Sequence, residues 1–152
     1  MLLNTGQAKT KISLEKVVSI ELATFSEESR GNLTVVQSTD DIPFSIARIF
    51  YLYGVRNDSE RGAHAHREAE QAIIAISGSF SLEVTNGRQS KTYAMNKPNR
   101  AMYVPPMIWA RVRNFSADAV CLVLTSAPYD PADYIRDWTE YVSVLGDRER
   151  SR

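Results

Sequence analysis

Short apolar runs separated by polar turns make up most of this chain. Residues 46–55 (IARIFYLYGV) are rich in β-branched and aromatic side chains, and residues 79–85 (SFSLEVT) alternate apolar with polar positions. Both patterns are typical of β-strands. Further strands are expected at residues 17–22, 33–37, 72–76, 91–95, 101–104, 109–112 and 119–125. About eight to ten short strands at this spacing predict an all-β sandwich or barrel.

The run 46–55 also predicts which side chains share a face. Alternate residues of a strand point to opposite sides of the sheet. Two sets of side chains are therefore expected on opposite faces: Arg48, Phe50 and Leu52 on one, and Ile49, Tyr51 and Tyr53 on the other.

Polar segments separate the strands, and the pattern changes near the C-terminus. Residues 24–32 are polar and end in Gly-Asn, which predicts a loop or turn, and Asn86-Gly87 predicts a hairpin. Residues 130–141 begin with Asp130, a suitable N-cap, and a proline at the first helical position, so we expect a short C-terminal helix. The two ends of the chain are expected to be loose, at residues 1–10 and 146–152.

Composition narrows the class of protein. A chain of 152 residues is expected to form one domain, residues 1–152. The net charge is zero and no basic block is present, which argues against nucleic acid or an anionic membrane as a partner. No apolar run is long enough to span a bilayer, and the first residues lack the apolar segment of a secretory signal, so we expect a cytoplasmic protein. The single cysteine, Cys121, is expected to be a small buried apolar residue.

The two histidines of the chain, His64 and His66, are separated by one small residue. On a strand their side chains would point to the same face. An imidazole titrates near neutrality, so such a pair favours general acid–base chemistry. The alternative is that both are merely satisfied polar residues near the end of a strand.

This pair and the order of strands favour a cupin-type jelly-roll barrel with a short C-terminal helix. His64, His66, Glu70 and Gly78 fit the first cupin motif, in which two histidines and a glutamate bind a divalent metal. A second motif would supply one more histidine, but Ala110 stands at that position. A three-histidine site therefore cannot be built within one subunit, although two histidines and Glu70 remain a possible ligand set. We predict no metal and no other cofactor.

Four stretches of the chain are distinctive together: GNLTVVQSTDDIPFSIARIFYLYGV, RGAHAHREAEQ, YVPPMIW and NFSADAVCLVLTSAPYDPADYIRDW. They resemble the WxcM-like sugar 3,4-ketoisomerases, which act on dTDP-4-dehydro-6-deoxyglucose. The similarity covers roughly residues 15–140. It implies a metal-free cupin, a homodimer with strands exchanged between subunits, and a dTDP-linked keto sugar as partner.

The resemblance implies roles for individual residues. His64 and His66 match the histidines of the family, and we slightly prefer His66 as the base that moves the carbon-bound proton. His64 and Tyr51 would handle the sugar oxygens, although Tyr51 can equally be a core residue. Arg48 and Arg61 would stabilise the enediolate or bind the diphosphate, with a structural ion pair as the alternative for Arg48.

Three further positions concern the substrate. Trp109 can stack on thymine, although a packed indole is the more common role. Glu70 is expected to orient a histidine or to pair with an arginine. Ala110 departs from the larger polar residue of relatives, which puts the sugar preference or the stereochemistry of the product in question.

The chemistry fits these residue types. In a 4-keto sugar the hydrogen on C3 is acidic, and its removal gives an enediolate that can be protonated at C4. The same histidine base would also suit a 3,5-epimerase. A non-catalytic sugar-nucleotide binding module and a metal-dependent oxygenase are the alternatives from other classes.

Overall fold

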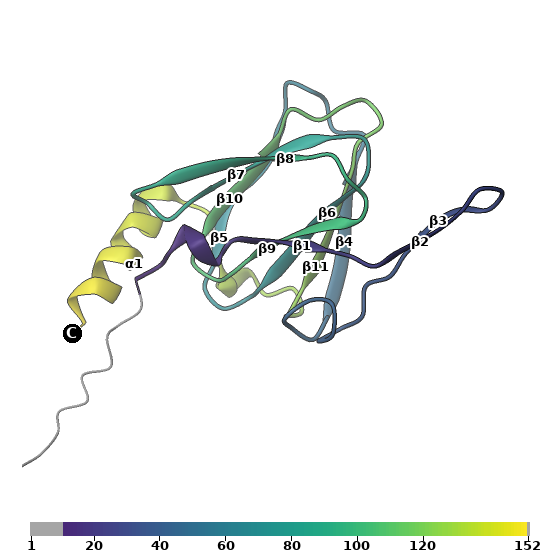
Figure 1. Ribbon diagram of the computed structural model, residues 1–152. Coiled ribbons are helices and arrows are strands. Elements are labelled where there is room, and N and C mark those ends of the chain that lie inside the picture. Colours follow the sequence, from purple (N-terminus) through teal and green to yellow (C-terminus); the bar gives the residue numbers. More distant parts are fainter. Residues whose placement is uncertain (1–10, 152) are drawn as a thin grey trace, which may run out of the picture.

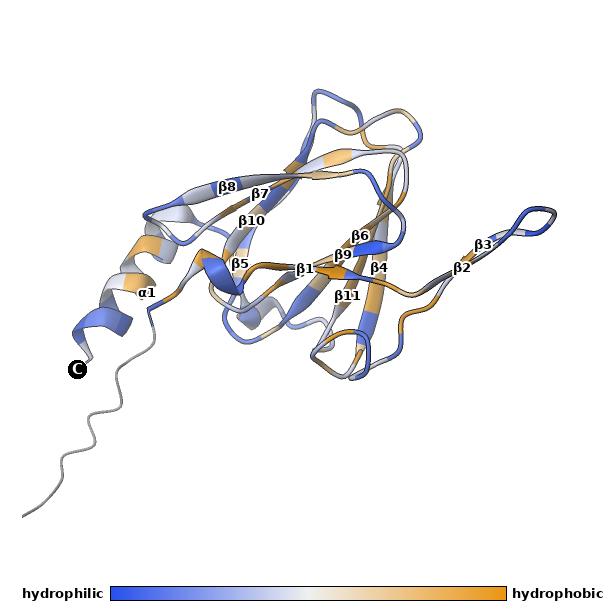
Figure 2. Ribbon diagram, in the orientation of Figure 1, coloured by the Kyte–Doolittle hydropathy of each residue, from blue (hydrophilic) through white to orange (hydrophobic). Residues whose placement is uncertain are grey.

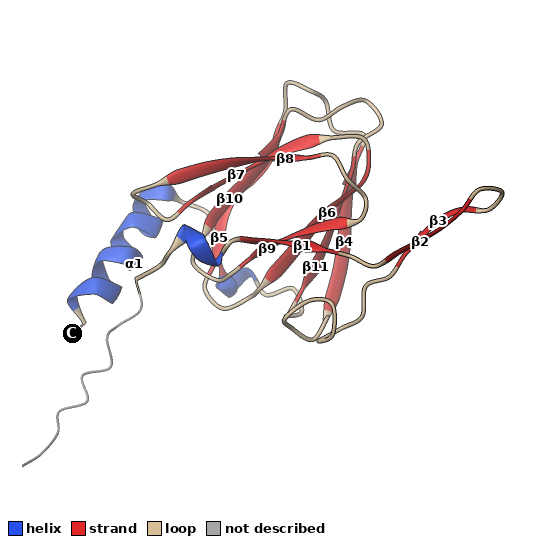
Figure 3. Ribbon diagram, viewed as in Figure 1, coloured by secondary structure: helices blue, strands red, loops and turns tan. Residues whose placement is uncertain are grey.

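The computed structural model describes residues 11–151, so the predicted loose tail at residues 1–10 lies outside the described residues. The chain forms a β-barrel of two five-stranded antiparallel sheets, with one α-helix at its side (Figures 1 and 3). The first sheet has the order β1 (Val18–Glu21), β9 (Arg100–Val104), β6 (Gln71–Ser77), β11 (Val120–Thr125) and β4 (Arg48–Tyr53). The second has the order β12 (Tyr134–Ile135), β5 (Glu60–His66), β10 (Trp109–Arg113), β7 (Phe80–Thr85) and β8 (Ser90–Met95).

The predicted all-β barrel with a C-terminal helix is thus confirmed. The main core lies between the two sheets, where inward-facing apolar residues of both pack together. The faces predicted for β4 are also confirmed, because Phe50 and Leu52 contact the core whereas Tyr51 and Tyr53 are 60% and 70% exposed. Cys121 is buried as predicted, and burial raises the pKa of its thiol to about 12.

The outer face of the first sheet has a core of its own. The segment between β3 (Gly31–Thr34) and β4 carries Ile42 and Phe44, which pack with Ala72, Ile74 and Leu124 on the outside of the sheet. This cover explains why β6 reads as a continuous apolar run, since its residues are buried on both faces. A short 3-10 helix, Leu14–Lys16, precedes β1.

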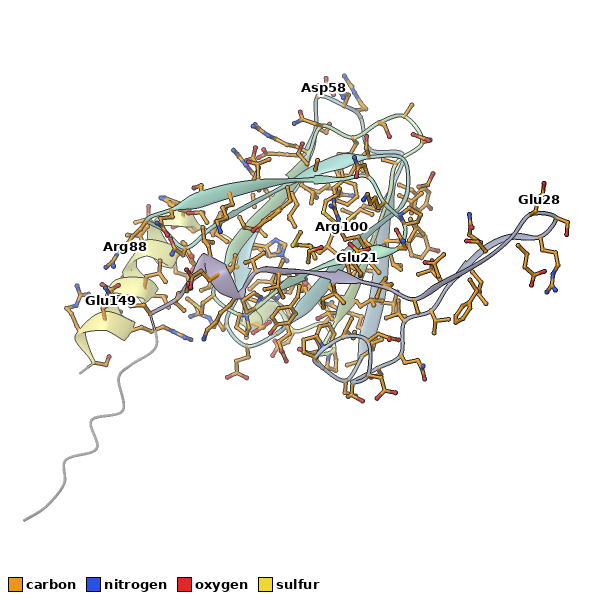
Figure 4. The ribbon with its side chains drawn as sticks, viewed as in Figure 1. Glu21, Glu28, Asp58, Arg88, Arg100 and Glu149 are labelled. Carbon is orange, nitrogen blue, oxygen red and sulfur yellow. The ribbon has the colours of Figure 1, made fainter. Side chains whose placement is uncertain are left out.

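The loop predicted at residues 24–32 is instead a hairpin of β2 (Thr24–Glu27) and β3. It projects from the barrel as an arm, on the side away from the C-terminal helix, and Glu28 lies at its tip (Figures 1 and 4). The tip is hydrophilic (Figure 2), which explains why the sequence resembles a loop. Phe25 and Leu33 face each other across the two strands and are each 62% exposed.

The C-terminal segment also differs from the prediction. Asp130 is an N-cap, but of a 3-10 helix, Pro131–Asp133, that leads into β12. The α-helix, α1, comes later at Trp138–Arg150 and begins at a second cap, Asp137, whose carboxylate accepts the backbone N–H of Glu140 at 2.8 Å. Most of the charged end that was expected to fray is therefore helical.

The α1 helix packs against the second sheet through aromatic residues. Tyr141 is fully buried, and its hydroxyl lies 2.9 Å from the carbonyl oxygen of Met107. At the far end of α1, Arg88 pairs with Glu149 at 2.6 Å (Figure 4). Between residues 11 and 151, no helix has both the length and the apolar character needed to cross a membrane.

Candidate active site

A cavity of about 480 Å³ lies inside the barrel, within the size range of small-molecule sites. Its wall is mostly apolar and comes from both sheets: Phe50, Leu52, Ile73, Leu82, Val112, Cys121 and Val123. Polar groups reach it from β5, β6, β10 and the segment after the 3-10 helix: Glu60, Arg61, His64, Gln71, Arg111, Tyr134 and Arg136. A larger open groove of about 990 Å³ lies between α1 and the β7–β8 loop, but it contains no histidine.

A β-bulge directs the histidines into the barrel. Along β10, Ala110 pairs with His64 and Arg111 pairs with Gly62, so Ala63 is an extra residue in β5. Gly62 has a φ of +88°, and a Cβ there would lie 3.1 Å from the carbonyl oxygen of Ala110. Glycine is therefore the residue that fits this point.

Beyond the bulge the predicted arrangement of the pair is confirmed. The His64 and His66 rings lie 5.0 Å apart between centroids, at an interplanar angle of 85°.

Both ring nitrogens of His66 have partners. Its Nδ1 lies 2.8 Å from Oδ2 of Asp133, and its Nε2 lies 3.1 Å from the amide nitrogen of Gln71. Asp133 is held in turn by the backbone N–H groups of Glu68 and Ala69. Burial lowers the pKa of His66, although the hydrogen bond and charge of Asp133 act in the opposite direction. The result is a neutral ring with Nδ1–H donating to the carboxylate.

His64 has a different environment. It lines the cavity, and its buried Nδ1 has no hydrogen-bond partner within residues 11–151. Burial, and after it the neighbouring His66, lower the pKa of His64 to about 4. The Gly62 carbonyl opposes this shift, although it lies outside hydrogen-bond geometry. His64 is therefore neutral at pH 7 and is free to accept a proton from a molecule in the cavity.

Tyr134 is the tyrosine beside the histidines. Its ring centroid lies 4.9 Å from that of His64 and 4.4 Å from that of His66. The Arg48 guanidinium donates to its hydroxyl at 3.2 Å, and the Arg136 guanidinium lies over its ring at 4.3 Å. A phenol between two cations and two imidazoles is well placed to exchange protons with an oxygen in the cavity.

Three residues predicted from the sequence lie elsewhere. Tyr51 is on the exposed outer face of β4, because β4 alternates and its inward positions belong to Phe50 and Leu52. Glu70 does not orient a histidine, since its carboxylate accepts the Tyr103 hydroxyl at 2.6 Å.

Trp109 packs edge-on against Trp138 of α1 at 5.2 Å and does not line the cavity. Its position corrects the proposed thymine contact in favour of the packed indole.

Other predicted positions do reach the cavity. Arg61 lines its exposed part, and Ala110 lines it directly opposite His64 in the strand pairing. Arg48 does not line it, but reaches it through Tyr134. The small side chain of Ala110 leaves space beside the proton-accepting ring.

Sequence reasoning missed four residues of the site: Gln71, Asp133, Tyr134 and Arg136. The last three belong to the stretch DPADYIRDW, which supported the family resemblance but was assigned to a helix. The available signal for Gln71 was a glutamine directly before the apolar run at residues 72–76. Among the described residues, no group of three His, Cys, Asp or Glu side chains is placed to hold a metal ion.

Comparison with known proteins gives the family. The model of the FdtA family (WxcM-like, C-terminal) matches residues 15–146. The chain belongs to the WxcM-like family. A TDP-4-oxo-6-deoxy-alpha-D-glucose-3,4-oxoisomerase from Aneurinibacillus thermoaerophilus is 34% identical over 118 residues, covering 78% of this chain and 85% of the relative.

Solved structures agree with this WxcM-like assignment. A 3,4-ketoisomerase from Helicobacter canadensis is 36% identical with a TM-score of 0.83, covering 86% of this chain and 97% of that one. The sugar 3,4-ketoisomerase QdtA from Thermoanaerobacterium thermosaccharolyticum, solved with TDP, is 32% identical with a TM-score of 0.86, covering 90% and 98%. The predictions of a cupin-type fold and of an isomerase family are therefore confirmed.

Proposed function

We propose that this chain is a 3,4-ketoisomerase that converts dTDP-4-dehydro-6-deoxyglucose to a dTDP-3-dehydro-6-deoxyhexose. One observation supports this most strongly: His64, which burial keeps neutral at pH 7, lines the cavity, and its ring lies 4.9 Å from the ring of Tyr134, which lines it too. A QdtA variant with histidine replaced by asparagine was crystallised with TDP-4-keto-6-deoxyglucose, which makes that sugar the first substrate to test.

The reaction needs a base at C3 and a proton donor at C4. The base removes the C3 proton, the C–H electrons form a C3=C4 double bond, and the C4 carbonyl electrons move to O4. The enediolate takes a proton on O4. Loss of the O3 proton then forms the C3 ketone as C4 is protonated. The net change is a transfer of two hydrogens, so no oxidant or reductant is required.

The geometry favours His64 as the carbon base. It lines the cavity, whereas both nitrogens of His66 are occupied and His66 lies behind the cavity wall. This reverses the slight preference for His66 that the sequence suggested. Tyr134 replaces Tyr51 as the group that exchanges protons with the sugar oxygens. Arg61 and Arg136, which are exposed at the cavity, are suited to the diphosphate.

The test is proton NMR of dTDP-4-dehydro-6-deoxyglucose incubated with the protein in heavy water. A 3-keto product with deuterium at C4 is expected, and its coupling pattern would give the configuration at C4. Deuterium at C5 would instead indicate a 3,5-epimerase. Binding of dTDP without any change in the sugar would indicate a binding module, and either result would overturn the proposal.

We further propose that the protein is a homodimer whose β2–β3 arm packs on a second subunit. Phe25 and Leu33 expose an apolar pair on a projecting hairpin, and an arm of this kind is marginal when it stands alone. The variant Leu33→Asp should lower the mass measured by light scattering to that of one chain. Glu28→Asp, a conservative change at the hydrophilic tip, is the matched control and should leave the dimer intact.

A further inference from the structure

Gln71 is an unusual residue for its position. It begins β6, faces inward, and is 6% exposed, whereas the next inward residues, Ile73 and Ala75, belong to the apolar core. A buried amide on an apolar wall is destabilising unless its polar atoms are satisfied. Its one hydrogen bond to a described side chain is to His66, and Gln71 also lines the cavity.

The hydrogen bonds behind Gln71 fix its orientation. Burial by itself raises the pKa of Asp133. The hydrogen bonds from His66 and from the backbone N–H of Glu68 outweigh this effect and lower the pKa. Asp133 is therefore a carboxylate, which can accept hydrogen bonds but cannot donate them. The proton of His66 must then sit on Nδ1, which leaves Nε2 as an acceptor. Gln71 must therefore turn its NH₂ group toward His66. In the opposite orientation its carbonyl oxygen would face the lone pair on Nε2 of His66, and two acceptors repel each other.

This arrangement uses one N–H of the amide and leaves the second without an assigned partner. An enediolate in an apolar cavity needs a preorganised donor at the oxygen where charge develops. We propose that Gln71 supplies that donor to the enediolate oxygen, and that Asp133 is a positioning residue that sets the amide through His66. The inference rests on the ketoisomerase reaction proposed above. In it His66 does not contact the substrate but orients the amide of Gln71.

The first test replaces Gln71 by Met, which has a similar shape and no donor. Removal of one donor to a developing oxyanion typically lowers kcat by about 100-fold or more. We expect such a loss in kcat for Gln71→Met, with KM changed less than about threefold, because the bond strengthens in the transition state. Unchanged kcat in a folded variant would overturn the role of Gln71.

The second test concerns Asp133 and has a readout that does not depend on turnover. The Glu68 N–H lies 2.7 Å from Oδ1 of Asp133, so in Asp133→Asn the amide oxygen should stay there and the NH₂ should face His66. His66 would then be forced to carry its proton on Nε2. Because the chain contains two histidines, ¹⁵N-histidine NMR resolves both rings, and we expect the proton on Nδ1 of His66 in the wild type and on Nε2 in the variant.

Asp130→Asn is the matched control. It makes the same change of charge three residues away, on the cap of the same 3-10 helix, where Asp130 contacts the Ala132 N–H and neither histidine. It should leave the tautomer and kcat as in the wild type. A tautomer that is the same in the wild type and Asp133→Asn would overturn the positioning role. If the wild type does not isomerise the keto sugar, the proposed function fails, whereas the tautomer result still decides the role of Asp133.

Discussion

Two segments build the reactive side of the cavity, and they differ in how their sequences relate to their structures. Residues 60–71 provide both histidines from β5, where their spacing already predicts a common face, and Gln71 from the start of β6, one residue before the predicted strand at 72–76. Residues 131–136 provide Asp133, Tyr134 and Arg136 from a stretch with the sequence signals of a helix start. The first segment holds the proposed base, and the second holds the groups that tune and assist it. Catalysis should therefore depend strongly on both, but in separable ways.

The largest effect is expected from the first segment. His64→Asn removes the base but keeps a smaller polar side chain, and a positioned acid–base group contributes about 100- to 10,000-fold. We expect kcat for isomerisation to fall by at least about 100-fold, while dTDP binding measured by calorimetry stays within about threefold of wild type. Comparable turnover by His64→Asn would show that His64 is not the carbon base.

A smaller loss is expected from the second segment. Tyr134→Phe keeps the ring that packs against both histidines but removes the hydroxyl that Arg48 contacts. If Tyr134 moves protons between sugar oxygens, kcat should fall about 10- to 100-fold, because solvent or another group can partly replace it. Tyr129→Phe is the control, since Tyr129 is 59% exposed and its ring lies 5.6 Å from that of Tyr134 without lining the cavity. Equal kcat in the two variants would remove Tyr134 from the mechanism.

The contrast between the segments also explains what the sequence could predict. The spacing of His64 and His66 determines their common face in any strand, so local pattern was sufficient there. Around Tyr134 local pattern was misleading, because the decisive contacts are with residues about 70 positions earlier in the chain. Tyr134 and Ile135 pair with His66 and Ala65, and Ile135 is fully buried.

Magnitudes show why the tertiary contacts prevail at this point. Burial of an isoleucine is worth about 2–5 kcal/mol, judged by its truncation to alanine, whereas ordinary helix propensities differ by less than about 0.7 kcal/mol per residue. Asp130 and Pro131 therefore start only a short 3-10 helix, which ends where Tyr134 and Ile135 pair with β5. The same reasoning applies to Tyr51: the alternation along β4 was predicted, but which face lines the cavity depends on how the two sheets pack.

The last test addresses the difference between the two histidines through the stability of the fold. The pKa of His64 is about 4 in the folded chain and about 6.5 when exposed, so between these values the unfolded chain binds a proton that the folded chain does not. The free energy of unfolding should therefore fall as the pH is lowered from about 6.5 to about 4. His66 and Asp133 also have lowered pKa values and act in the same direction, so the wild-type curve alone cannot isolate His64.

The variant His64→Asn isolates the contribution of His64 to this pH dependence, because it removes one titrating ring and leaves the Asp133–His66 pair in place. We expect its urea-unfolding free energy to decrease less steeply over this pH range than that of the wild type, with the two curves parallel above about pH 7. Parallel curves throughout the range would mean that His64 titrates normally in the folded chain. The burial that lowers the pKa of the His64 ring in the folded chain would then be ruled out.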